Sequence, residues 1–235
     1  MHSLTNTRPD DWHLHARDGD MLAAVLPDTA KRFARAIVMP NLKPPVRTVA
    51  EAAAYRDRIL AVLPKEMAFE PLMTLYLTDN TSPEVIYKAR ESGFVHAVKY
   101  YPAGATTNSD SGVTDIRRVE DALAAMEEAG LPLLLHGEVT DPQIDLFDRE
   151  AVFIEQVLEP LLQRRPGLRV VLEHITTSRA VEFVTAAPAN VGATITVHHL
   201  LYNRNAMFQG GIRPHYYCLP VLKRESHREA LVSAA

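Results

Sequence analysis

Short apolar runs recur along the chain, and longer stretches with helical spacing of apolar residues lie between them. Seven runs have the length of a strand: Trp12–Ala16, Ala36–Pro40, Leu72–Leu77, Ala97–Tyr101, Pro132–His136, Arg169–His174 and Ala193–His198. Successive runs begin about 30 residues apart, which is the length of one strand–helix–strand unit. The pattern therefore predicts an α/β protein in which strands and helices alternate.

The stretches between the runs are rich in Ala, Leu, Glu and Arg, which favour helices. Helices are expected at Val49–Leu63, Pro83–Ser92, Arg118–Ala129, Arg149–Arg164 and Ser178–Ala186, with a last helix at Leu222–Ala235. Leu133–Leu135 and Val170–Leu172 are apolar without alternation, as expected for parallel strands that are buried on both faces.

Two architectures use this alternation, a doubly wound open sheet and a (β/α)8 barrel of the TIM type. An open nucleotide-binding sheet would carry a glycine-rich turn after its first strand, but Arg17-Asp18-Gly19-Asp20 follows here. The barrel is therefore favoured, with residues 1–235 as a single domain. Only about seven βα units are visible, so the predicted barrel is incomplete and lacks its eighth strand.

Composition narrows the function classes. Of the 235 residues, 47% are apolar, and the formal net charge is −4 without a basic block, which argues against nucleic acid or an anionic membrane as the main partner. No apolar run approaches the ~20 residues of a membrane span, and the polar start Met1–Asp11 lacks a signal-peptide core. Cys218 is the only cysteine, which excludes an intrachain disulfide and fits a reducing compartment. We expect a cytoplasmic protein.

Four histidines lie at predicted strand ends. His13 and His15 end the first strand and project from the same face, while His136 and His174 end two buried strands. One such histidine is more often a hydrogen-bonded core residue than a ligand. Four at the rim where barrel active sites form favour a metal centre, because neutral imidazole is a common zinc ligand. Glu173 neighbours His174 and is expected to point the opposite way, towards a helix.

Lys99 ends the fourth strand, and its ordinary interpretation is a solvated lysine. Inside a cluster of histidines and cations, a protonated lysine would be unfavourable because like charges repel. Deprotonation and reaction with carbon dioxide would give a carbamate that can bridge two cations. His198 and His199 end the seventh predicted strand, where at most one could face the rim. We expect neither to be a ligand.

The motifs together resemble the bacterial dihydroorotases of the amidohydrolase superfamily, from about Arg8 to about Arg228. The segments that carry the resemblance are Asp11–Met21, Val38–Leu42, Lys99–Asn108, Leu135–Thr140, Leu146–Glu150, Glu173–Thr177 and Tyr217–Pro220.

The resemblance implies reversible cyclisation of N-carbamoyl-L-aspartate to L-dihydroorotate in pyrimidine synthesis. It implies two zinc or other divalent ions held by His13, His15, His136 and His174 and bridged by N6-carboxylated Lys99. The implied substrate contacts are His15, Ala16, Arg17, Asn41, Thr106, Thr107, His136 and Leu219. Arg17 and Asn41 would bind the substrate carboxylate, and the two threonines belong to a closing loop. A homodimer is also implied.

The family's catalytic aspartate ends an eighth strand, which would lie beyond Ala235. The catalytic residue is therefore unknown within these residues, and the 235-residue chain is expected to have low or no activity. Two alternatives remain: another cyclic-amide hydrolase of the hydantoinase or allantoinase type, and a non-catalytic homologue that binds metal or a partner. The first alternative is disfavoured by Arg17, Asn41 and the threonine loop, which suit a substrate that bears a free carboxylate. The second alternative, a non-catalytic homologue, is disfavoured because the chain retains all five candidate metal ligands.

Overall fold

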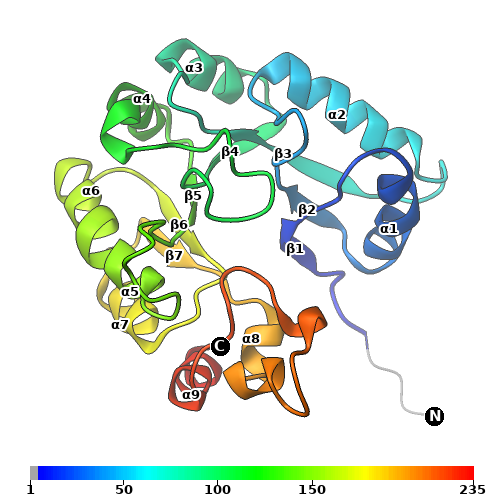
Figure 1. Ribbon diagram of the computed structural model, residues 1–235. Helices are drawn as coiled ribbons and strands as arrows, with labels where there is room; N and C mark the ends of the chain where they lie inside the picture. Colours follow the sequence, from blue (N-terminus) through cyan, green and yellow to red (C-terminus); the bar gives the residue numbers. More distant parts are fainter. Residues whose placement is uncertain (1–4) are drawn as a thin grey trace.

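The computed structural model describes residues 5–235, so the first four residues of the polar start lie outside it. Seven parallel strands form one sheet in chain order: β1 (Asp10–Leu14), β2 (Arg35–Val38), β3 (Glu70–Tyr76), β4 (Val95–Tyr100), β5 (Leu133–His136), β6 (Val170–Glu173) and β7 (Val191–Ala193). The sheet curls around a common interior with the helices outside it, and β1 and β7 form its two edges (Figure 1). The structure confirms the predicted incomplete TIM-type barrel.

The helices are α1 (Gly19–Arg32), α2 (Val49–Ala61), α3 (Pro83–Glu91), α4 (Glu120–Ala129), α5 (Arg149–Phe153), α6 (Glu159–Arg164), α7 (Ser178–Ala186), α8 (Val197–Leu201) and α9 (Glu225–Ala234). Short 3₁₀ turns lie at Ile116–Val119, Arg204–Met207 and Pro214–Tyr216. Helix α1 was not predicted, and its sequence carries a proline, Pro27, in the helix interior. None of the helices in residues 5–235 is long and apolar enough to cross a membrane.

Local sequence sets several helix ends. Helix α2 begins with a capping box in which Thr48 and Glu51 each satisfy the other's backbone N–H. Helix α4 stops at Gly130, whose φ of 64° suits the left-handed position after a helix. The predicted helix at 149–164 is split by a π-helical turn over Ile154–Leu158, just before Pro160. A proline cannot donate to the preceding turn, so the wider π turn accommodates it.

Buried apolar side chains pack against both faces of the sheet. A large core lies between the sheet and the outer helices and includes Leu133 and Leu135. A smaller interior cluster is formed by Ile37, Met39, Leu72, Ala97 and Leu134, with Val171 packed against it. The central residue of the Leu133–Leu135 run thus faces inward and its neighbours face outward, which confirms burial of this strand on both faces.

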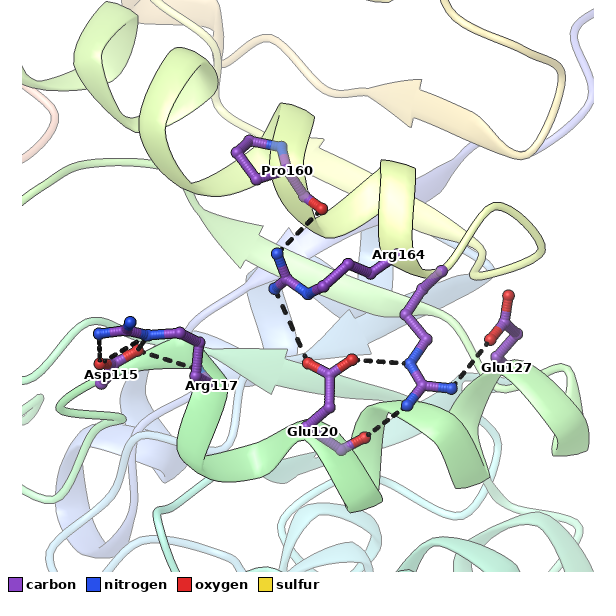
Figure 2. Close-up of polar contacts among 7 residues, drawn as sticks. Asp115, Arg117, Glu120, Glu127, Pro160 and Arg164 are labelled. Carbon is purple, nitrogen blue, oxygen red and sulfur yellow. Dashed lines mark hydrogen bonds and ion pairs between the residues drawn. The ribbon is translucent and has the colours of Figure 1, made fainter.

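The outer surface carries ion pairs that join neighbouring helices. Glu120 of α4 accepts a hydrogen bond from Arg165 Nε at 2.9 Å and lies 3.7 Å from Arg164 NH2, while Arg164 also donates to the Pro160 carbonyl (Figure 2). Arg165 also reaches Glu127, with the closest atoms 3.6 Å apart. These contacts link α4 to the end of α6.

The seventh strand differs from its prediction. It ends at Ala193, and the chain then leaves the sheet and forms α8, so His198 and His199 lie on a helix and not at a strand end. Thr194 is engaged by the neighbouring loop: its hydroxyl accepts from the His174 N–H at 2.9 Å and its carbonyl accepts from the Ile175 N–H at 2.9 Å. The Thr194–Val197 run thus does not form the predicted end of the strand, despite its β-propensity.

Candidate metal centre and substrate cavity

A cavity of about 250 Å³ opens at the carboxyl ends of the strands. Barrel sheets gather residues from distant segments at this rim, because all parallel strands end there. Its lining residues are His13, His15, Arg17, Asn41, Tyr101, Thr106, Thr107, His136, His174, Thr196, His198, His199, Cys218, Leu219 and Pro220. All four histidines predicted as ligands are among them.

The four predicted ligand histidines form a row of adjacent rings. The ring centres of His13 and His15 are 5.0 Å apart, those of His13 and His174 are 5.0 Å apart, and those of His136 and His174 are 4.9 Å apart. The Nε2 atoms of His13 and His15 lie 3.1 Å from each other. At least two imidazoles therefore present nitrogens to one shared point.

Lys99 lies fully buried inside the barrel beside this row. Its Nζ contacts the Glu173 carboxylate and lies 4.9 Å from the centre of the Tyr101 ring. Burial lowers the pKa of Lys99, although the Glu173 charge opposes that shift. Lys99 is thus a desolvated amine next to the imidazoles, and the alternative of a solvated strand-end lysine is wrong.

Glu173 faces the barrel interior, which corrects the expectation that it points towards a helix. It pairs in register with His136 of β5, and its Oε1 lies 2.9 Å from His13 Nδ1. Burial alone would raise the pKa of Glu173, but the charge of Lys99 and then of His13 holds it at about 2. Strand alternation places Val171 and Glu173 on the inner face, so the error lay in assigning that face to His174.

His174 reaches the cavity because the alternation stops there. Its φ is 44°, a left-handed conformation that is uncommon for a residue with a side chain. This turn directs His174 inward immediately after Glu173, so that two consecutive side chains enter the same site. Backbone strain of this kind costs about 1–3 kcal/mol and is concentrated at functional sites.

The ring nitrogens are arranged by neighbouring side chains. His15 Nδ1 donates to Asn41 Oδ1 at 2.9 Å, and His136 Nε2 donates to Glu138 Oε2 at 2.7 Å. Each of these bonds leaves the lone pair on the other ring nitrogen. Burial, with smaller contributions from His13 and Arg17, lowers the pKa of His15 to about 3. Burial also lowers the pKa of His136 and His174, so these three rings are neutral at pH 7 and available as ligands.

Several buried polar atoms at this point suit a cation. Among residues 5–235, His174 Nδ1 has no hydrogen-bond partner, and His13 Nδ1 and Glu173 Oε1 have none besides their own close approach of 2.9 Å. Ligand atoms of His13, Glu173 and His174 all lie within 4.8 Å of one another. Unpartnered buried nitrogens and carboxylate oxygens are costly unless an ion or water satisfies them. The donor set therefore fits a divalent metal, and Glu173 joins it as a residue that sequence reasoning missed.

Two predicted substrate residues lie at the mouth of the cavity. Arg17 adopts a left-handed φ of 61°, and its carbonyl accepts a 2.6 Å hydrogen bond from the buried Tyr55 hydroxyl. Leu219 lines the same cavity from the C-terminal side. The neighbouring Ala16 is fully buried, backbone included, and does not line the cavity.

Asn41 joins the histidine cluster to the predicted loop. Its Nδ2 donates to the Thr107 carbonyl at 3.0 Å, and its carbonyl accepts from Asn108 Nδ2 at 2.9 Å. Thr106 and Thr107 line the cavity next to it. The Thr107 carbonyl uses one of the two N–H groups of the Asn41 amide, which leaves the other for a ligand carboxylate.

His198 and His199 both line the cavity, contrary to the expectation that at most one could do so. Their position on a helix explains this, because strand alternation does not apply there. His199 Nδ1 lies 2.6 Å from the Thr196 hydroxyl and its Nε2 lies 3.1 Å from the Pro220 carbonyl. His199 thus links α8 to the segment that carries Leu219, which is a structural role and not a ligand role.

Some of the missed residues left a signal in the sequence. Glu138 lies two residues after His136, a spacing that would put both on one face if the strand continued, and Glu173 is the register partner of His136. Thr194 and Tyr55 left no such signal, because their partners are 20 and 38 residues away.

Comparison with known proteins agrees with this geometry. The amidohydrolase family model matches residues 11–235. A dihydroorotase of Cupriavidus taiwanensis is 76% identical over 232 residues, which cover 99% of this chain and 67% of that protein.

Two solved structures are also similar. A dihydroorotase from Campylobacter jejuni has 39% identity and a TM-score of 0.89, covering 97% of this chain and 65% of that one. A dihydroorotase from Saccharomyces cerevisiae, solved with 5-fluoroorotic acid, has 32% identity and a TM-score of 0.87. The match covers 96% of this chain and 65% of that one. The chain thus spans about two thirds of the length of these relatives.

Proposed function

The chain belongs to the dihydroorotases of the amidohydrolase family, and on this premise we propose that its cavity binds L-dihydroorotate and N-carbamoyl-L-aspartate for their reversible interconversion. The observation that carries the proposal is the convergence of four imidazoles and Lys99 beside a cavity that Arg17 also lines. The ligand named for the yeast relative, 5-fluoroorotic acid, is also a pyrimidine carboxylate.

We propose that His13, His15, His136 and His174 hold two zinc or other divalent ions and that carboxylated Lys99 bridges them. When bound, the ions would supply Lewis acidity towards the amide carbonyl and make a water nucleophile available at neutral pH. The buried Lys99 supports the carboxylation, because burial lowers its pKa. Once deprotonated, its amine would form an N–C bond with carbon dioxide and release one proton, giving a carbamate. Glu173 occupies the vicinity of Lys99 in the described structure and would have to give up this contact.

The other cavity residues would bind and orient the substrate. Arg17 offers a planar guanidinium that can pair with both oxygens of the substrate carboxylate. Asn41 would add a hydrogen bond from the second N–H of its amide, and the backbone at Leu219 would contact the ring. Ala16 is buried, so its predicted contact would need a local rearrangement. Closure of the Thr106–Thr107 loop over the ligand would exclude water from the reacting amide.

In hydrolysis, water adds to the ring carbonyl, the C–N bond breaks and the leaving nitrogen gains a proton. The resemblance assigns this proton transfer to an aspartate on an eighth strand. Residues 1–235 do not include it, so we propose that a polypeptide of these residues alone binds metal and ligand but turns over slowly.

The remaining parts of the proposal concern domain organisation, oligomeric state and cellular location. We propose that residues 1–235 act as one domain, since the seven strands form one sheet around one interior. A homodimer and a cytoplasmic location stay predictions, and sedimentation of the purified chain would test the first.

The ligand-binding test uses the 235-residue chain loaded with zinc. We expect close to two zinc ions per chain and calorimetric binding of L-dihydroorotate, with much weaker binding of hydantoin and allantoin, which lack its carboxylate. His174→Ala should lower the zinc content, whereas His215→Ala, at an exposed histidine outside the cavity, should not. Zinc-free protein, or preference for hydantoin, would contradict the proposal.

The carboxylation of Lys99 has its own test. Zinc-loaded protein supplied with ¹³C-bicarbonate should show a carbamate carbon resonance that is absent from Lys99→Arg. Lys88→Arg, at an exposed lysine of α3, is the matched control and should retain the resonance. If the signal is missing from the wild-type protein, the bridge is not a carbamate.

A further inference from the structure

Glu150 is a buried carboxylate outside the cavity that binds the turn following β6. Only 2% of its surface is exposed, although it lies in the first turn of α5. Its two oxygens accept from both the N–H and the hydroxyl of Thr176 and of Thr177, at distances of 2.6–3.0 Å. Four donor groups from two consecutive residues therefore meet one carboxylate.

The turn that Glu150 holds comes two residues after His174. His174 has the left-handed φ of 44° that directs its ring into the cavity, and its N–H is held by the Thr194 hydroxyl. Thr194 thus holds the backbone at His174, and Glu150 holds the backbone two and three residues later. A strained conformation persists only when its surroundings determine it in this way.

The charge of Glu150 is suited to this role. Burial raises the pKa of its carboxyl, while the buried Lys223 and the threonine hydrogen bonds oppose that shift. Both oxygens act only as acceptors towards these donors, which favours the ionised form. Hydrogen bonds to an ionised acceptor are about twice as strong as neutral ones.

We propose that Glu150 is a positioning residue for the metal centre: it holds the Thr176–Thr177 turn so that His174 presents its ring to the cation. This rests on the proposed function, because it takes His174 as a ligand. Glu150 does not touch the cavity, so its effect is transmitted through the backbone. Outer residues that orient metal ligands typically contribute 10–100-fold to metal affinity.

Two substitutions separate this role from general stability. Glu150→Gln keeps the shape of the side chain but turns an NH₂ group towards N–H and hydroxyl donors. It therefore removes part of the hydrogen bonding to Thr176 and Thr177. Thr176→Val removes only the hydroxyl bond of 2.9 Å and keeps the buried volume. The matched control is Glu120→Gln, which removes a hydrogen-bonded carboxylate on the outer surface. Glu120 does not line the cavity and is joined to Arg164 and Arg165 (Figure 2).

The first measurement is Co²⁺ binding by the 235-residue chain, followed by calorimetry and by the visible spectrum of the bound ion. We expect Glu150→Gln to weaken the affinity of one Co²⁺ by roughly 10–100-fold and to alter its spectrum. Thr176→Val should weaken it several-fold, and Glu120→Gln should match the wild type. A folded Glu150→Gln protein with wild-type Co²⁺ affinity and spectrum would overturn the inference. If the wild type binds no Co²⁺, the metal centre itself is refuted.

The second measurement needs no metal. Amide hydrogen exchange of His174 and Ile175 in the metal-free protein should be faster in Thr176→Val and Glu150→Gln than in Glu120→Gln. If Glu150→Gln does not fold, Thr176→Val decides the question. Unchanged exchange at these two amides in folded Thr176→Val would show that the turn is not held by Glu150.

Discussion

Replacing Tyr55 by Phe should weaken both the fold and ligand binding through one lost hydrogen bond. The Tyr55 side chain is fully buried, and its hydroxyl donates to the Arg17 carbonyl at 2.6 Å. The substitution leaves that carbonyl without its partner, at a cost of about 1–3 kcal/mol. Arg17 is already in a left-handed conformation that is disfavoured by roughly 1–2 kcal/mol, so this bond helps to hold it there.

The matched control is Tyr87→Phe. Its hydroxyl donates to Glu128 Oε2 at 2.7 Å, but the side chain is 38% exposed, so water replaces the lost partner. We expect a change within about 0.5 kcal/mol there. Two bonds of similar length should therefore differ several-fold in their contribution to stability because of burial alone.

Urea unfolding followed by circular dichroism measures the stability of both variants, and calorimetry of the zinc-loaded chain measures L-dihydroorotate affinity. We expect Tyr55→Phe to lose roughly tenfold in affinity, the equivalent of about 1.4 kcal/mol, because the Arg17 guanidinium is no longer held. Tyr87→Phe should bind as the wild type does. If the two variants differ by less than 0.5 kcal/mol in unfolding and bind equally, Tyr55 does not position Arg17.

Four further outcomes follow from the structure. Gly137→Ala should destabilise the protein by about 1–3 kcal/mol in urea unfolding, because the added Cβ would lie 2.4 Å from Leu172 Cδ1; wild-type stability would contradict this. Arg17→Lys should weaken calorimetric L-dihydroorotate binding by roughly tenfold, since lysine lacks the planar fork; equal affinity would exclude a paired carboxylate. The side-chain hydrogen bond from Arg117 lowers the pKa of Asp115 to about 2, below its ordinary 3.8, so this pair stabilises the protein above about pH 4 and loses that contribution between pH 4 and 2 (Figure 2). Asp115→Asn should flatten this part of the stability–pH curve slightly, as the pair is exposed. Removing zinc with a chelator should lower the melting temperature, by the equivalent of about 2.7 kcal/mol if zinc had been at 100 times its Kd; an unchanged melting temperature would argue against the centre.

The sequence determined most of the architecture. The alternation of short β-branched runs with helical stretches gave the order and approximate place of all seven strands, because parallel strands buried on both faces need continuous apolar runs. Helix α7 has the predicted bounds, and the ends of α2 and α3 fall within two residues of those expected. The four histidines were identifiable because each lies within one residue of a strand end.

The tertiary structure alone decided which side chains enter the site. Strand alternation gives the inner face to Glu173, and only the left-handed turn at His174 brings the next residue inward as well. The His174 N–H donates to Thr194, and Glu150 binds the Thr176–Thr177 segment that follows; these two residues are 20 and 24 positions from His174. Likewise, His198 and His199 share the cavity because β7 ends at Ala193 and the chain continues as α8. Local periodicity fixes which residues form an element, but contacts between distant segments fix where that element stops and how its last residue is turned.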